Sequence, residues 1–135
     1  MHRAIAAGIF AVCLLLCAPT AWGALVINEI LTNVPNGGDN GNEYVEISGN
    51  ASESLSNVWL LVIDDDGAAN GTILNAVNIG ALSATVGTNG LLLVEDAASV
   101  SWSPAQNGAT TRVVSNFAPD IPNIATCFAL VTSFT

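Results

Sequence analysis

From residue 24 onward, short apolar runs alternate with polar turns, as is typical of an all-β protein. The runs are rich in β-branched residues, and Asn, Gly, Asp, Ser and Pro separate them. No segment has the period of an amphipathic helix. Seven strands of this length predict an immunoglobulin-like β-sandwich. The predicted strands span residues 25–31, 43–48, 58–64, 72–79, 90–95, 111–117 and 126–134.

Two of these runs indicate how their strands are buried. In 43–48, Val45 and Ile47 alternate with polar residues, so we expect one face of this strand to be buried and the other to be open. The run 58–63 is apolar at every position, which is typical of a strand covered on both sides. We therefore expect a central strand there, with Trp59 anchored in the core.

The first residues read as a cleavable signal peptide over 1–23. A basic start precedes an apolar stretch over 4–18, and Ala21-Trp22-Gly23 places small residues at the positions that signal peptidase requires. We expect cleavage before Ala24, and hence a secreted, extracytoplasmic product. A retained membrane anchor is one alternative, although it needs about 20 apolar residues. Lipid attachment at Cys17 is another, although lipid-modified cysteines usually follow a smaller residue than leucine.

Removal of residues 1–23 leaves a strongly acidic domain over 24–135. It keeps eleven carboxylates against one basic side chain, Arg112, for a formal net charge of −10. Such a charge repels nucleic acid and anionic membranes, so we expect neither nucleic-acid binding nor stable membrane insertion after cleavage. Cys127 is the one remaining cysteine, which excludes an internal disulfide. We expect it to be buried as a small hydrophobe, with pairing to another chain as the alternative.

The residues of common hydrolases are missing. Residues 24–135 contain no histidine and no lysine, which excludes Ser-His-Asp and Cys-His mechanisms and leaves too few ligands for zinc. Paired carboxylates remain, as in glycosidases, but Glu43 and Glu46 stand three residues apart on a strand and so face opposite ways. We expect no catalytic residue and no organic cofactor.

Two polar turns hold candidate ligands for calcium. The first turn offers Asp39, Asn42 and Glu43, and the second offers Asp64 and Asp66. Calcium takes six to eight oxygen ligands, which turns can gather, but neither sequence matches the EF-hand spacing. The alternative is that these side chains bond the local backbone, as Asp and Asn commonly do in turns.

Three sequence blocks carry a family resemblance. They are LVINEI over 25–30, NEYVEI over 42–47 and LSNVWLLVID over 55–64. In order and spacing they resemble the opening of bacterial lamin-tail domains. The chain departs from that pattern at 48–50, where Ser-Gly-Asn displaces an asparagine that often follows the second block. The resemblance implies an immunoglobulin-like sandwich that serves secreted or surface proteins as a binding or structural module, and it implies no catalytic residue.

We therefore expect a secreted, non-catalytic module whose partner is a protein or surface ligand. One alternative is a calcium-dependent adhesion module, and another is the leader domain of a larger secreted nuclease or phosphatase-type hydrolase. The last predicted strand ends on apolar residues, with Phe134 expected on the same face as Phe128 and Leu130. Since domains usually end in a polar tail, we expect the protein to continue past Thr135.

Overall fold

The computed structural model describes residues 24–33, 42–67, 70–82, 84–96, 108–115, 117, 120–123 and 125–134. The expected signal peptide and the candidate ligand Asp39 lie outside these ranges. Each predicted strand is present, with ends that differ by at most a few residues. The strands are β1 (Val26–Leu31), β2 (Tyr44–Ser48), β3 (Val58–Asp64), β4 (Ile73–Asn78), β5 (Leu91–Glu95), β6 (Thr111–Val114) and β7 (Thr126–Thr132), with a 3-10 helix η2 (Gly80–Leu82).

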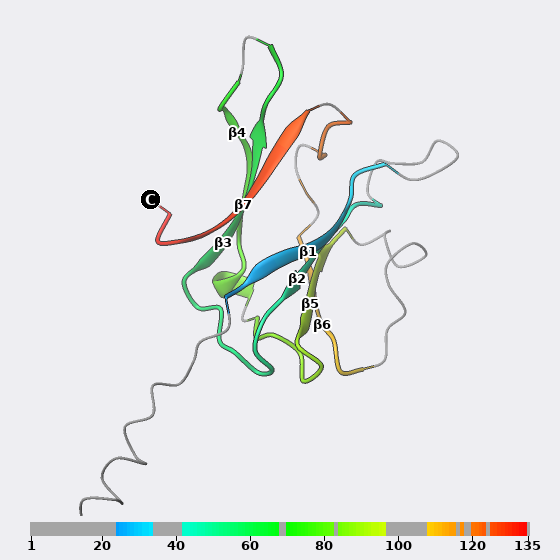
Figure 1. Cartoon of the computed structure of the whole chain (residues 1–135), viewed down its shortest axis with the longest axis vertical. Coiled ribbons are helices and arrows are strands. Elements are labelled where there is room, and N and C mark those ends of the chain that lie inside the picture. Colours follow the sequence, from blue (N-terminus) through cyan, green and yellow to red (C-terminus); the bar gives the residue numbers. More distant parts are fainter. Residues whose placement is uncertain are drawn as a thin grey trace, which may run out of the picture.

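The strands form two sheets packed face to face, which confirms the expected seven-stranded β-sandwich. One sheet has the order β1-β2-β5-β6 and the other has the order β4-β3-β7. Figure 1 shows β3, β4 and β7 on one side of the molecule and β1, β2, β5 and β6 on the other. Neighbouring strands are antiparallel except β5 and β6, which run parallel. Within the described ranges, no helix is long and apolar enough to cross a membrane.

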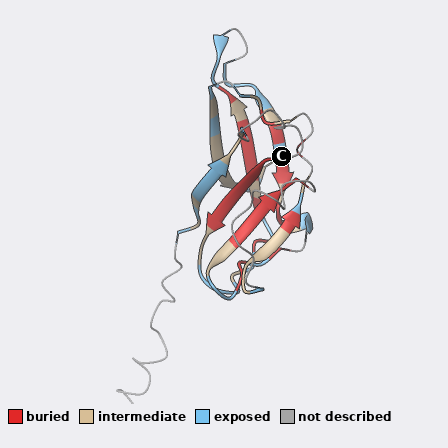
Figure 2. Ribbon diagram, turned by 90° about the vertical axis from the view of Figure 1, so that its right-hand side faces the viewer, coloured by how far each residue is buried: buried red, intermediate tan, exposed pale blue. Residues whose placement is uncertain are grey.

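The core lies between the sheets and is built from alternate residues of the inner strands. Figure 2 shows the buried parts of these strands in red. The four-stranded sheet contributes Val45 and Ile47 from β2, and the three-stranded sheet contributes Leu60 and Val62 from β3, all of them fully buried. Apolar side chains pointing inward from both sheets supply the hydrophobic stabilisation of the sandwich.

β3 is the central strand of its sheet, as predicted, but Trp59 is not in the core. Leu60 points between the sheets, so Trp59 and Leu61 lie on the face turned away from the other sheet, which we call the outer face. Leu61 is buried there, whereas Trp59 is half-buried. The ring of Trp59 meets that of Phe134 edge-on, with centroids 5.4 Å apart. The expectation of a core tryptophan was wrong because an unbroken apolar run does not show which alternate set faces inward.

The end of β7 also differs from expectation. Phe128 and Leu130 pack against the core, but Phe134 packs on Trp59, on the outer face. The backbone of Ser133 has a φ of 65°, and its N–H donates to the Asn57 carbonyl at 3.2 Å. This left-handed turn breaks the strand alternation and carries Phe134 to the outer face.

Cys127 is exposed, so its expected burial was wrong. It lies on the outer face near the start of β7, an edge strand, where Ile63 is its neighbour on β3. The negative charge of Asp65 is the main cause that raises the pKa of this thiol above its usual value. The thiol therefore carries little thiolate at neutral pH, which lowers its reactivity.

Candidate functional site

Three carboxylates meet at one end of the sandwich. Glu43 directly precedes β2, Asp96 directly follows β5, and Asp120 lies between β6 and β7. Antiparallel pairing of β2 with β5 places Tyr44 opposite Glu95, and this brings the residues just beyond them together. A carboxylate oxygen from each of the three lies within 4.8 Å of the other two. We call these residues the acidic cluster.

The acidic cluster covers the end of the hydrophobic core. Strand alternation directs Glu43 to the same side as Val45 and Asp96 to the same side as Val94, and both of those valines are core residues. Glu43 is 1% exposed and Asp96 is 3% exposed. Two carboxylates are therefore held away from water beside apolar side chains, a placement that requires hydrogen-bond donors.

Backbone N–H groups supply those donors. The Ile121 N–H donates to Oε2 of Glu43 at 2.8 Å. The Glu43 N–H donates to Oδ2 of Asp96 at 3.4 Å, while the Asp96 N–H donates to the Glu43 carbonyl at 3.0 Å. These bonds tie the start of β2, the end of β5 and the segment before β7 to one another. The acidic cluster thus has a clear structural role in joining three chain segments.

Burial raises the pKa of Asp96 above its usual value. Backbone N–H groups of Glu43 and Phe117 favour the charged form and lower the pKa, whereas the negative charge of Asp120 raises it. Chemically, the arrangement can hold a proton between its carboxylates or accept a hard cation through oxygen ligands.

A second set of polar side chains covers the outer face of the four-stranded sheet. The Tyr44 hydroxyl donates to Oε1 of Glu29 at 2.7 Å, and the Asn28 amide donates to Oε1 of Glu46 at 2.6 Å. Tyr44 and Glu46 are both buried, so the expectation that this face of the strand is open was wrong. Burial, followed by the hydrogen bond and the charge of Glu29, raises the pKa of Tyr44 to about 12.

Arg112, the one basic side chain of residues 24–135, belongs to the same outer face. Its guanidinium pairs with the carboxylate of Glu95, which is 1% exposed. A charge as buried as Glu95 needs such a partner. The Arg112 guanidinium therefore neutralises the buried charge of Glu95.

The predicted calcium ligands divide between two places. Glu43 belongs to the acidic cluster, and Asn42 directly precedes it. Asp64 and Asp66 belong to the turn after β3, where Oδ1 of Asp64 accepts from the Asp66 N–H at 2.8 Å. That bond is the local backbone capping that Asp commonly makes in turns. Neither residue of this turn is among the carboxylates gathered within 4.8 Å of Glu43.

The sequence analysis missed Asp96 and Asp120. Asp120 is isolated in the sequence, and Asp96 has only Glu95, the last residue of a predicted strand, beside it, so neither lies in an acid-rich turn like those that drew attention. The available signal was that Asp96 directly follows one predicted strand, 90–95, and that Glu43 begins another, 43–48. Only the pairing of β2 with β5 turns those two positions into neighbours.

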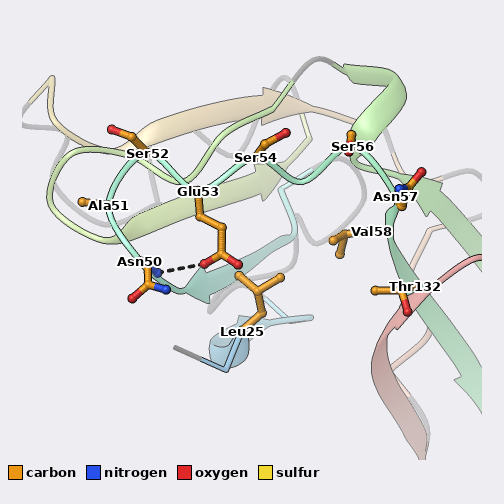
Figure 3. Close-up of a pocket in the computed structure, with 10 residues that line it drawn as sticks. All are labelled: Leu25, Asn50, Ala51, Ser52, Glu53, Ser54, Ser56, Asn57, Val58 and Thr132. Carbon is orange, nitrogen blue, oxygen red and sulfur yellow. Dashed lines mark hydrogen bonds between the residues drawn. The ribbon is translucent and has the colours of Figure 1, made fainter. Parts of the chain in front are cut away.

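A pocket of about 640 Å³ lies at the other end of β2 (Figure 3). Glu53 is the one charged residue among its described lining residues, and Oε2 of Glu53 accepts from the Asn50 N–H at 3.2 Å. General acid–base chemistry needs a positioned titratable side chain, and Glu53 is the one carboxylate in this lining. The lining residues are Leu25, Asn50, Ala51, Ser52, Glu53, Ser54, Ser56, Asn57, Val58 and Thr132.

Comparisons of the chain with known protein families, with curated proteins and with solved structures found no match.

Proposed function

We propose that this protein is an extracytoplasmic, non-catalytic module that binds a protein or surface ligand or supports a larger assembly. The observation that carries the proposal is the ion pair of Arg112 with buried Glu95. No other basic side chain and no histidine occurs in residues 24–135. The domain therefore has no free cationic side chain to bind a phosphate and no imidazole to move a proton near neutral pH.

The three blocks that resemble lamin-tail domains lend further support. They form β1, β2 and β3, and polar residues of the first two blocks bond to one another. Asn28 bonds to Glu46, and Glu29 bonds to Tyr44, so these side chains hold two neighbouring strands together. Polar residues used in this way serve the fold, as expected of a module whose family resemblance implies no catalytic residue.

The direct test uses the chain exported by an expression host. Intact-mass measurement should give a product that begins at Ala24, and a panel of phosphodiester, phosphomonoester and glycoside substrates should show no turnover. The sharp control is Asp96→Asn, which alters the acidic cluster. Turnover that the wild type shows and Asp96→Asn lacks would overturn the proposal, as would retention of residues 1–23.

A calcium-dependent fold makes a different prediction in a thermal unfolding experiment. A bound ion stabilises the folded state by mass action, so a chelator would lower the midpoint and added calcium would raise it. Under our proposal, the midpoint is the same in chelator and in calcium. A shift that Asp120→Asn abolishes would assign the acidic cluster to calcium.

A further inference from the structure

The four edge strands of the sandwich differ in how they are protected against pairing with another chain. Edge strands present unpaired N–H and carbonyl groups, and proteins commonly block them with bulges, charges or short length. β1 has an extra residue, Asn28, in its pairing with β2, and β4 has an extra residue, Leu74, in its pairing with β3. β6 has only four residues and includes Arg112. Three edges thus carry a recognised protective feature.

The β7 edge carries none of these features. Its seven residues, TCFALVT, include no charge, no proline and no glycine. They pair with β3 without a register shift, from Thr126 opposite Asp64 to Thr132 opposite Val58. No residue of β7 is buried, and no described residue pairs with its second edge. Within the part of the chain that the structure describes, β7 is therefore a regular, uncharged strand whose second edge is unpaired.

The sequence of β7 is also symmetric in side-chain character about its centre. Ala129 is flanked by Phe128 and Leu130, then by Cys127 and Val131, and the strand begins and ends with threonine. An interface across a two-fold axis must be complementary to itself. If residue i of one copy contacts residue j of the other, then residue j of the first copy contacts residue i of the second. An antiparallel partner centred on Ala129 meets that condition, because each large or small side chain faces one of similar size.

We propose that β7 pairs with the β7 strand of a second copy of this chain, antiparallel and centred on Ala129. In this register Phe128 lies opposite Leu130 of the partner on the core side. Cys127 lies opposite the partner's Val131 on the outer face. The two three-stranded sheets then join into one sheet with the order β4-β3-β7-β7-β3-β4.

This assembly closes at two copies. Both ends of the joined sheet are β4 strands, and β4 carries a bulge that opposes further pairing. The result is a dimer and not a fibre. Since each copy carries a net charge of −10, repulsion weakens the dimer at low salt, and screening should strengthen it.

Sedimentation of the exported chain tests the stoichiometry. The protein concentration should reach about 1 mM, because small interfaces are weak. We expect a reversible monomer–dimer equilibrium that shifts toward dimer as salt is added. A monomer at every concentration overturns the proposal, as does a series of species larger than a dimer.

A matched pair of lysine variants tests the edge. Ala129→Lys places like charges opposite each other across the two-fold axis and should weaken the dimer about tenfold or more. Ala76→Lys is the control, since Ala76 stands in the same cross-strand row, next to Leu61, on the opposite edge of the sheet. It should leave dimerisation unchanged. If the two variants weaken dimerisation equally, the proposal is overturned. Thermal unfolding of each variant at dilute concentration shows whether it still folds.

Oxidative crosslinking tests the register. In the double variant C127S/A129C, the introduced thiols meet at the two-fold axis, within the range of directly opposed residues. We expect a covalent dimer from this variant and none from the wild type, whose Cys127 residues lie four strand positions apart. Crosslinking through Cys127 of the wild type, or no crosslink in a variant that sediments as a dimer, overturns the proposed register.

Discussion

The two sheets of this sandwich have outer faces of opposite character. On the four-stranded sheet, Tyr44, Glu46 and Glu95 are polar or charged, yet each is less than 6% exposed. On the three-stranded sheet, Trp59 and Ile63 are apolar, yet both are only half-buried. Polarity along the sequence therefore does not report burial in this protein. The difference lies in hydrogen bonding, because a polar group can be buried when it is given a partner.

The partners come from neighbouring strands. Tyr44 bonds to Glu29, Glu46 accepts from Asn28, and Glu95 pairs with Arg112. On the other sheet, the described outer face includes the apolar ring contact of Trp59 with Phe134. The polar side chains of one face thus have specific partners, while the aromatic side chains of the other are in ring contact. Variants should affect the two faces in distinguishable ways.

The largest effect should come from Leu93→Ala. Leu93 is 0% exposed and lies among the polar residues of the four-stranded outer face, opposite Glu46 in the strand register. Its removal should lower the free energy of unfolding by about 2 to 5 kcal/mol, because a cavity opens beside buried charges. Ile63→Ala, at a half-buried position of the other outer face, should lower the free energy of unfolding less in the same urea unfolding experiment. If Ile63→Ala were the more damaging, the comparison of the faces would be reversed.

Trp59→Ala should have a smaller effect of about 2 kcal/mol, because the side chain is only half-buried. A double-mutant cycle with Phe134→Ala should give a coupling energy of about 0.5 to 1.5 kcal/mol from the edge-on ring contact. Additive losses from the two variants would mean that the rings do not stabilise each other in solution.

Tyr44 provides a spectroscopic measure of the polar face. It is the one tyrosine of the chain, so tyrosinate absorbance reports it alone, and we expect a pKa of about 12. Because this pKa is raised above the ordinary value of 10, the stability it contributes is fully present below pH 10 and is lost as the pH rises through 12. Glu29→Gln should lower the pKa only in part, since burial is the largest cause. A value near 10 in the wild type would show that Tyr44 is open to water.

The smallest effect concerns Asp120→Asn. The charge of Asp120 helps to raise the pKa of Asp96, so its loss should stabilise the fold near pH 7 by roughly 0.5 kcal/mol. The raised pKa means that Asp96 supports folding at low pH and that this support is lost as the pH rises above the usual aspartate range. A destabilised Asp120→Asn protein in chelator would show that this carboxylate is a needed hydrogen-bond partner.

Strand positions were predictable because each strand is a local pattern. The run from Val58 to Asp64 became β3 with the predicted ends, and its unbroken apolar character correctly placed it at the centre of a sheet. The same character hid its orientation, since Trp59 and Leu60 are equally suited to the core. Tertiary pairing decided which of the two points inward.

The acidic cluster was predictable only in part, because it depends on contacts between distant segments. Glu43 was a candidate from its own turn, but Asp96 and Asp120 reach it through the β2–β5 pairing and the segment before β7. Similarly, nothing local distinguishes a parallel β5–β6 pair from an antiparallel one. Sequence patterns identify the elements, and long-range pairing determines which side chains meet.

The pairing of β3 with β7 also has a consequence for the order of folding. Leu61 lies opposite Ala129. The central strand β3 can therefore pair with β7 only after β7 has been synthesised, much later along the chain. Until β7 has been synthesised, the apolar strand β3 has one unpaired edge. Such non-local closure slows folding and leaves nascent chains open to aggregation. The three-stranded sheet can therefore be completed only after synthesis has passed Thr132, and a chaperone that shields β3 before then would raise the yield of folded protein.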